Sequence, residues 1–179
     1  MYQKQIYIIT GGPGFGKTEL VKELRRAGYL CSQEFARDLI EKQMSIGGEI
    51  LPWKNPKLFQ EEILRKRIAF FESVPDGVVA FADRGIPDQL AFARYKGFGA
   101  PEILIQSSLK YRYSPLVFVT PPWSDIFAND DVRTESYNDA VWIHQFVLDA
   151  YIGLNYQAIE LPLSSVKSRV EFILQTIKL

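Results

Sequence analysis

The sequence contains a single cysteine, Cys31, and a single histidine, His144, among its 179 residues. One cysteine excludes an internal disulfide framework and a multi-cysteine zinc site, and one histidine excludes a histidine-rich metal centre. The chain has no excess of either charge, since 21 basic residues balance 21 acidic ones. This balance argues against a protein that coats nucleic acid or an anionic membrane through bulk charge.

Long apolar runs are also missing from the sequence. No uncharged stretch approaches the roughly 18 residues that a membrane-spanning helix needs, and residues 1–10 carry no long apolar signal core. Hydrophobic residues still make up 47% of the chain, which is enough for a packed core and excludes a disordered chain. The composition therefore predicts a cytoplasmic protein in which residues 1–179 form one domain.

Stretches typical of strands alternate along the chain with stretches typical of helices. β-Branched and aromatic residues predict strands, and apolar residues at helical spacing predict helices. The expected strands are residues 5–10, 29–31, 78–82, 116–120 and 158–161. The expected helices are residues 17–27, 34–44, 57–73, 87–96, 101–111, 137–153 and 164–177. Such alternation predicts an α/β fold, with a parallel sheet covered by helices on both faces.

A glycine-rich segment between the first expected strand and the first expected helix carries the clearest motif. It matches G-x-x-x-x-G-K-[ST] at every fixed position and consists of Gly11, Gly12, Pro13, Gly14, Phe15, Gly16, Lys17 and Thr18. Glycines let the backbone wrap closely around a phosphate, and both the N–H groups and the following helix favour an anion. Lys17 is expected to bridge the β- and γ-phosphates of a nucleotide, and the Thr18 hydroxyl to ligate Mg²⁺. No N-K-x-D guanine-reading motif is present, so ATP is the expected nucleotide.

Two acidic residues follow the apolar strand expected at 78–82. Asp83 stands at the carboxyl end of that strand, which is where open α/β sheets bind their ligands. We interpret it as an acid on the Mg²⁺ side of the site or as a base for an acceptor hydroxyl, the alternative being a helix cap or an ion pair with Arg84. Asp88 is either an acceptor-binding residue or an acid in the first turn of the next helix, where the helix dipole favours it.

Other charged residues are candidates for the acceptor and for the transferred phosphate. Glu34 and Arg37 share one helical face, so Glu34 could take a hydroxyl proton while Arg37 grips an anionic group; the alternative is an exposed ion pair. Arg84 would join them in binding the acceptor. Arg133 lies in the polar stretch 121–136, which is expected to form a lid that brings this arginine to the γ-phosphate. The alternative for Arg133 is a solvated loop charge.

Together these residues resemble the kinase-like branch of the P-loop NTPases, and within it the small AAA domain family of predicted ATPases related to nicotinamide riboside kinases. The resemblance is carried by GGPGFGKT from Gly11, the E-x-x-R of Glu34 and Arg37, DRGIPD from Asp83, VFVTPP from Val117, the D-x-R of Asp131 and Arg133, and AIELPLSSVKSRVEFIL from Ala158. It implies a three-layer fold whose five-stranded parallel sheet has the strand order 2-3-1-4-5. It also implies that Asp131 and Arg133 belong to the lid.

The motifs and the resemblance favour a small-molecule kinase that uses ATP and Mg²⁺ to phosphorylate a nucleoside-like or other metabolite acceptor. Its catalytic residues would be Lys17, Glu34, Asp83 and Arg133. The alternative is a regulatory ATPase, or nucleotide-dependent switch, that acts on a partner protein. The third expected strand is followed by Asp-Arg rather than Asp-Glu, so no glutamate is placed there to polarise water. This favours transfer to a bound acceptor over hydrolysis.

Overall fold

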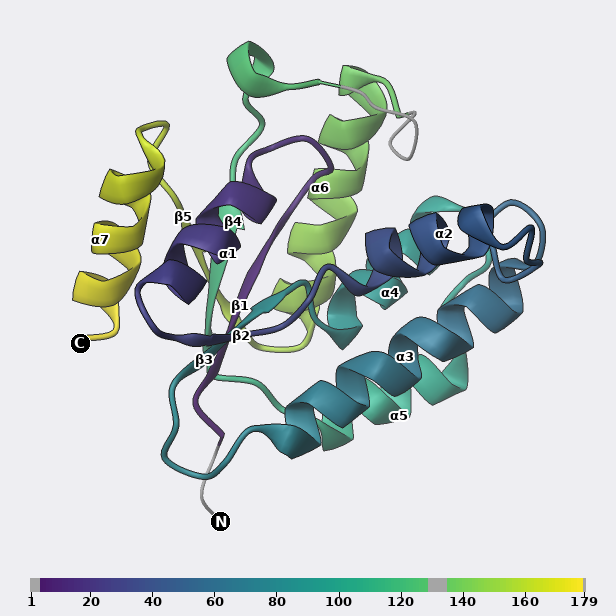
Figure 1. Ribbon diagram of the computed structural model, residues 1–179, viewed down its shortest axis with the longest axis horizontal. Coiled ribbons are helices and arrows are strands. Elements are labelled where there is room, and N and C mark those ends of the chain that lie inside the picture. The colour runs from purple at the N-terminus through teal and green to yellow at the C-terminus, as the bar shows by residue number, and fades with distance from the viewer. Residues whose placement is uncertain (1–3, 129–134, 179) are drawn as a thin grey trace.

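The computed structural model describes residues 4–128 and 135–178. Five parallel strands form one sheet in the order β2-β3-β1-β4-β5 (Figure 1). The strands are Ile6–Gly11 (β1), Leu30–Cys31 (β2), Ala80–Asp83 (β3), Leu116–Thr120 (β4) and Gln157–Glu160 (β5). The predicted α/β class and strand order are therefore confirmed. β3 begins two residues later than expected and ends on Asp83 instead of before it.

Helices connect all of these strands, as a parallel sheet requires. In the described residues they are Lys17–Arg26 (α1), Phe35–Ser45 (α2), Pro56–Ser73 (α3), Ile86–Tyr95 (α4), Glu102–Lys110 (α5), Tyr137–Gly153 (α6) and Val166–Thr176 (α7), with a short 3₁₀ helix at Ser124–Ile126 (η1). Every expected helix is present, with boundaries that differ by at most two residues. Pro101 is the N-cap of α5. Among the described residues, no helix is long and apolar enough to cross a membrane.

The central strands divide the core between the two faces of the sheet, because alternate side chains point to opposite sides. On β1, Ile6 and Ile8 are buried on one face and Ile9 on the other. The neighbouring strands repeat the pattern, so Phe81 and Phe118 share the face of Ile9. Helices α3, α4, α5 and α6 cover the face of Ile6 and Ile8, whereas α1 and α7 cover the opposite face (Figure 1).

A third, smaller apolar cluster joins α2 to α3 away from the sheet. It consists of Leu39, Ile40, Leu51, Phe59 and Ile63. This cluster holds α2 beside the carboxyl end of the sheet, where parallel strands expose the loops that bind ligands. The fold therefore brings the glycine-rich loop, the end of β3, the segment after β4 and the beginning of α2 to one edge.

Candidate nucleotide and acceptor site

The glycine-rich loop between β1 and α1 adopts a backbone that most residues would avoid. Gly14 and Gly16 both have φ of +79°, in the left-handed region. A methyl group on Gly14 would also lie 2.5 Å from the Phe127 ring. Gly16 is the N-cap of α1 and makes no side-chain cap, so the first N–H groups of the helix remain directed at the loop. Such an arrangement favours binding of an anion.

Lys17 and Thr18 connect this loop to its surroundings in different ways. The Lys17 side chain is 7% exposed, and its Nζ donates to the Gly12 carbonyl oxygen across the loop at 2.5 Å. The Thr18 hydroxyl donates to Glu34 Oε2 at 3.0 Å. Because Glu34 caps α2, this bond ties the phosphate loop to the first turn of a different helix.

Phe15 supports the loop from behind. Its side chain is fully buried, so only the backbone of this residue can face a nucleotide. The ring packs edge-on against Tyr137 and His144 of α6, with centroids 6.0 and 6.1 Å away, and lies 6.2 Å from Phe127. The shape of the loop is therefore held by an aromatic cluster. Two of its members flank residues 129–134 in the sequence, Phe127 before them and Tyr137 after them.

Asp83 ends β3 behind the phosphate loop and is 5% exposed. Its backbone N–H donates to the Ser32 hydroxyl at 2.9 Å. Burial raises the pKa of Asp83 to about 6, a shift that the positive charge of Lys17 opposes and the negative charge of Glu34 increases. Asp83, Lys17 and Glu34 are therefore close enough to influence one another electrostatically, although they come from three separate segments.

Asp88 is a buried hydrogen-bonding centre. The sequence placed it among the acceptor-binding candidates, but its side chain is fully buried and does not line the cavity described below. It accepts bonds from Thr10 Oγ1 at 2.5 Å, Tyr151 Oη at 2.6 Å, Gly85 N at 2.8 Å and Arg84 Nη1 at 2.8 Å. Asp88 therefore reaches the site only through Arg84.

Arg84 is held in an unusual conformation by this carboxylate. Its φ is +63°, a left-handed value that is uncommon for a residue with a side chain. Burial disfavours the charge on Arg84, but Asp88 and Asp83 outweigh that effect and raise its pKa. The guanidinium also lies 5.3 Å from the centroid of the Phe92 ring. A fixed positive charge therefore stands directly after the acidic end of β3.

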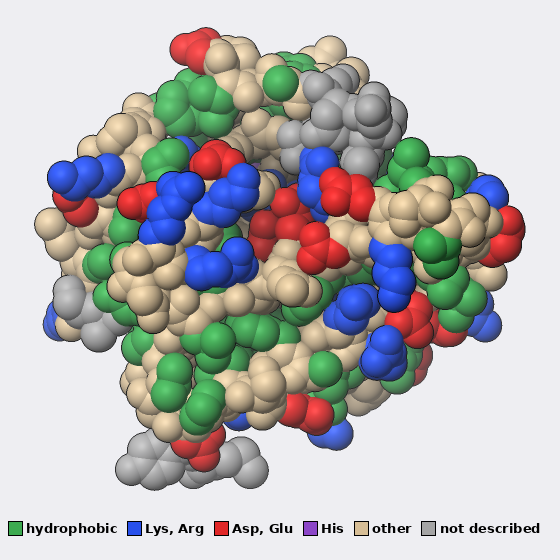
Figure 2. Space-filling model, viewed as in Figure 1, with side chains coloured by type: hydrophobic (Ala, Val, Ile, Leu, Met, Phe, Trp, Pro, Cys, Tyr) green, Lys and Arg blue, Asp and Glu red, His purple; other side chains and the backbone are tan. Residues whose placement is uncertain are grey.

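A cavity of about 600 Å³ joins these parts into one site. At one end it is lined by Gly14, Gly16, Lys17 and Thr18 of the phosphate loop, and at the other by Glu34, Ala36, Arg37, Ile40 and Arg84. Glu34 Oε1 and Arg37 Nε are 3.6 Å apart, as their sequence spacing predicted. Figure 2 shows acidic and basic side chains gathered between α1 and α2 on this face. The volume is in the usual range for a small-molecule site.

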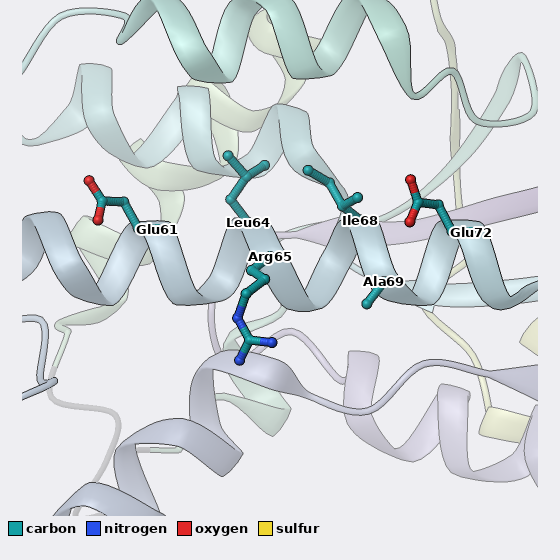
Figure 3. A pocket seen from close by; sticks show the side chains of 6 residues that line it. All are labelled: Glu61, Leu64, Arg65, Ile68, Ala69 and Glu72. Carbon is teal, nitrogen blue, oxygen red and sulfur yellow. The ribbon is translucent and has the colours of Figure 1, made fainter.

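Another hollow, of about 350 Å³, lies on the surface of α3. Figure 3 shows that all six of its labelled side chains come from this one helix and are spread along it, with Arg65 pointing away from Leu64 and Ile68. They do not converge on a common point, and none belongs to the site between the phosphate loop and α2. We therefore assign it no binding role.

Two buried arginines near the site were missed in the sequence. Arg67 of α3 is 6% exposed and carries a positive charge that helps to keep the Asp88 carboxylate ionised, while its Nε and Nη1 have no hydrogen-bond partner among the described residues. Arg169 of α7 is 3% exposed and lines the cavity. Both lie on the apolar face of a helix, Arg169 beside Val170 and three residues after Val166. A charged residue at a position where the helical pattern expects an apolar one is the sequence feature that could have identified both arginines.

Comparison with known proteins connects this geometry to a family. A family model described as AAA domain matches residues 6–169. The chain belongs to the AAA domain family. No curated protein sequence gives a significant match to this AAA domain protein.

Solved structures show that the AAA domain protein has the fold of P-loop kinases. Deoxyadenosine kinase from M. mycoides, with the products dCMP and dCDP bound, is 13% identical, with a TM-score of 0.67 over 97% of this chain and 98% of that one. The NadR protein in complex with NR is 17% identical, with a TM-score of 0.64 over 97% of this chain, which spans about 50% of NadR. Shikimate kinase from Acinetobacter baumannii in complex with shikimate is 15% identical, with a TM-score of 0.57 over 99% of this chain and 94% of that one.

The residues of the AAA domain protein suit Mg²⁺ bound together with a nucleotide. Among the described residues, no group of three or more histidine, cysteine, aspartate or glutamate side chains is arranged to hold a metal by itself. Mg²⁺ characteristically needs only one or two protein oxygens, because phosphates and water supply the remaining ligands. The Thr18 hydroxyl and the Asp83 carboxylate are hard oxygen donors of this kind. Asp131 and Arg133, assigned to the lid, lie outside the described residues.

Proposed function

We propose that this AAA domain protein is a kinase that transfers the γ-phosphate of ATP to a hydroxyl group of a small-molecule acceptor. The observation that carries the proposal is the single cavity that runs from the phosphate loop to Glu34, Arg37 and Arg84. A nucleotide and an acceptor bound at its two ends would meet end to end. The proposal is further supported by a fold shared with kinases of small molecules, two of which were solved with nucleoside-type ligands.

The phosphate loop would bind the nucleotide through its backbone and through Lys17. The N–H groups that follow Gly14 and Gly16 offer several donors to the phosphate oxygens. Lys17 Nζ now bonds the Gly12 carbonyl, and we propose that it exchanges this neutral acceptor for the β- and γ-phosphates. The positive end of α1 adds to the same attraction. Because these groups are preorganised, they need little rearrangement as charge develops during transfer.

The acceptor would bind at the α2 end of the cavity. Glu34 is our candidate for the base that removes the hydroxyl proton, and Arg37 and Arg84 for the groups that bind the acceptor. The bond between Asp88 and Arg84 supports the assignment of Arg84, since it fixes the guanidinium before any ligand arrives. Fixing a long side chain in advance lowers the entropy that is lost on binding. Asp88 itself would act only by holding Arg84.

Thr18 and Asp83 are the residues that would hold Mg²⁺, whose charge neutralises phosphate oxygens in phosphoryl transfer. The Thr18 hydroxyl donates its proton to Glu34, and its oxygen lone pairs would remain available to hold the metal. Arg133 is our candidate for the arginine that a lid at 121–136 brings to the γ-phosphate. These assignments divide the candidate residues between nucleotide, metal and acceptor, and each can be tested separately.

The test of the proposed function is a screen for acceptor-dependent ADP release. Nucleosides, vitamins and sugars are supplied in turn with ATP and Mg²⁺, and ADP is measured. We expect at least one acceptor to raise the rate well above the rate with water alone. ADP release that no acceptor raises, but that a partner protein changes, would support the regulatory ATPase instead.

Two variants then separate the base from the metal-holding acid. Glu34→Gln is expected to lower the transfer rate while leaving the affinity for ATP with Mg²⁺ close to wild type, because the base acts on the acceptor. Asp83→Asn is expected to weaken the binding of ATP with Mg²⁺ more than that of metal-free ATP. If the two variants exchange these effects, the two roles must be exchanged as well.

A further inference from the structure

Arg169 lies near the start of α7, on the wall of the cavity beside the phosphate loop. Its side chain is 3% exposed and lines the same cavity as Gly16, Lys17 and Thr18. A methyl group placed on Gly16 would lie 3.1 Å from Arg169 Nη1 and 3.5 Å from Nη2. The guanidinium therefore reaches the N-cap residue of α1, beside the first N–H groups of the helix.

This guanidinium has no anionic partner in the part of the chain that the structure describes. Its Nε is buried without a hydrogen-bond partner among those residues. Burial lowers the pKa of Arg169, and no neighbouring charge contributes to the shift. Taking a cation out of water without a counter-charge costs free energy. An anion bound in the cavity would supply the missing counter-charge and offset this cost.

Trp123, which follows β4, restricts the orientation of the guanidinium. The Arg169 Cζ atom lies 5.4 Å from the centroid of the Trp123 ring, within cation–π distance. The planar guanidinium therefore has both an indole and the backbone of Gly16 as close neighbours. Such restriction suits recognition of a phosphate oxygen, because arginine binds anions through a rigid fork of donors. The contact also connects α7 to the segment that leads to η1.

We propose that Arg169 binds the phosphate chain of the nucleotide, as a second cation beside Lys17. The residue lies outside the glycine-rich motif and comes from α7, which packs with α1 on the opposite face of the sheet from α3, α4, α5 and α6. The inference rests on the proposed nucleotide site but is independent of the identity of the acceptor. Trp123 serves as a positioning residue for the guanidinium.

The test measures the affinity of the protein for ATP and for tripolyphosphate, which has the phosphate chain but no base. Arg169→Gln is expected to weaken both ligands by about 10- to 100-fold, the usual value of a charge-assisted hydrogen bond. Arg26→Gln is the matched control, since this α1 arginine is exposed and pairs with Glu23. Arg169→Lys keeps the charge but loses the fork, so an intermediate loss is expected.

Several outcomes would overturn the inference. If Arg169→Gln leaves tripolyphosphate affinity unchanged, the phosphate contact does not exist, and a loss confined to ATP would assign the arginine to the base. If Lys17→Ala abolishes binding of both ligands while Arg169→Gln does not weaken either, the inference fails and the proposed function stands. If the wild-type protein binds neither ligand, both fail together.

A stability measurement distinguishes ligand binding from a purely structural role. Removing a buried cation that lacks a counter-charge should leave the free energy of unfolding unchanged or increase it. We therefore expect Arg169→Gln to unfold at the same urea concentration as the wild type, or a higher one, while binding the two ligands more weakly. A variant that loses stability and affinity together, with Arg169→Lys equally unstable, would identify Arg169 as a structural residue and overturn the proposal.

Discussion

The single histidine makes the packing of α6 behind the phosphate loop testable through the pH dependence of the free energy of unfolding. His144 is 6% exposed, and its Nδ1 has no hydrogen-bond partner among the described residues. Burial, assisted by the positive charges of Lys17 and Arg84, lowers the pKa of His144 from 6.5 to about 4. The unfolded chain lacks these influences, so its histidine keeps the ordinary value.

The pKa difference fixes both the sign and the size of the effect. As the pH falls through 6.5, the unfolded chain binds a proton that the native His144 does not, so the free energy of unfolding decreases. The decrease continues until the pH reaches about 4, where the native imidazole also becomes protonated. The gap between the two pKa values corresponds to a loss of about 3 kcal/mol, since one pKa unit is worth about 1.4 kcal/mol.

Asp83 acts in the opposite direction over an overlapping range. Its native pKa of about 6 is above the ordinary value of 3.8. The native state therefore binds a proton before the unfolded state does, and this gain in stability is lost again as the pH rises through about 6. The wild-type curve combines both effects. The contribution of His144 must consequently be measured as a difference between the wild type and a variant.

The assay is urea unfolding of the wild type and of His144→Gln between pH 7.5 and pH 4. We expect the variant to gain up to about 3 kcal/mol relative to the wild type across this range. The control combines His144→Gln with Gln145→His, which moves the histidine to an exposed neighbouring position on α6. This control should follow the single variant. Wild-type and His144→Gln curves that stay parallel at every pH would refute the reasoning.

Two further perturbations test the phosphate loop and the buried carboxylate. Lys17→Ala should weaken ATP binding by about 100-fold in a calorimetric titration, because a charge-assisted contact to phosphate is lost; Lys57→Ala, at an exposed position on α3 that does not line the cavity, should bind as the wild type does. Asp88→Asn should lower the free energy of unfolding by about 3–5 kcal/mol, since it leaves a buried cation without its anion. Asp149→Asn, on the exposed side of α6, should lower it little, and equal urea midpoints for the two aspartate variants would contradict the assignment of Asp88.

The sequence alone determined the fold class and the phosphate loop, because both depend on local patterns. Apolar runs of strand length alternate with helical periods, and such a sequence can bury its strands only in a parallel sheet covered on both faces. The loop from Gly11 to Thr18 needs glycines at fixed places, since Gly14 and Gly16 adopt left-handed backbone angles. The pairing of Glu34 with Arg37 follows from helical spacing for the same reason. None of these features requires knowledge of distant contacts.

Tertiary structure decided which charged groups face the cavity and which support it from behind. Asp83 and Asp88 are both buried and neither lines the cavity, yet only packing shows that Asp88 is enclosed by Thr10, Gly85 and Tyr151 and contacts the site through Arg84. The contacts of Asp88 with Thr10 and Tyr151 join residues more than sixty positions apart, so no local pattern encodes them. Their formation depends on how α4 and α6 pack on the sheet.

Arg169 shows the same distinction at the other end of the site. In the sequence it is one charge on an otherwise apolar helical face, close to the end of the chain. Only the packing of α7 against α1 brings its guanidinium beside Gly16 and under Trp123. The sequence specifies where a phosphate can bind, because that site is built from consecutive backbone N–H groups. The arrangement of side chains around it is set by helices that meet only when the sheet is complete.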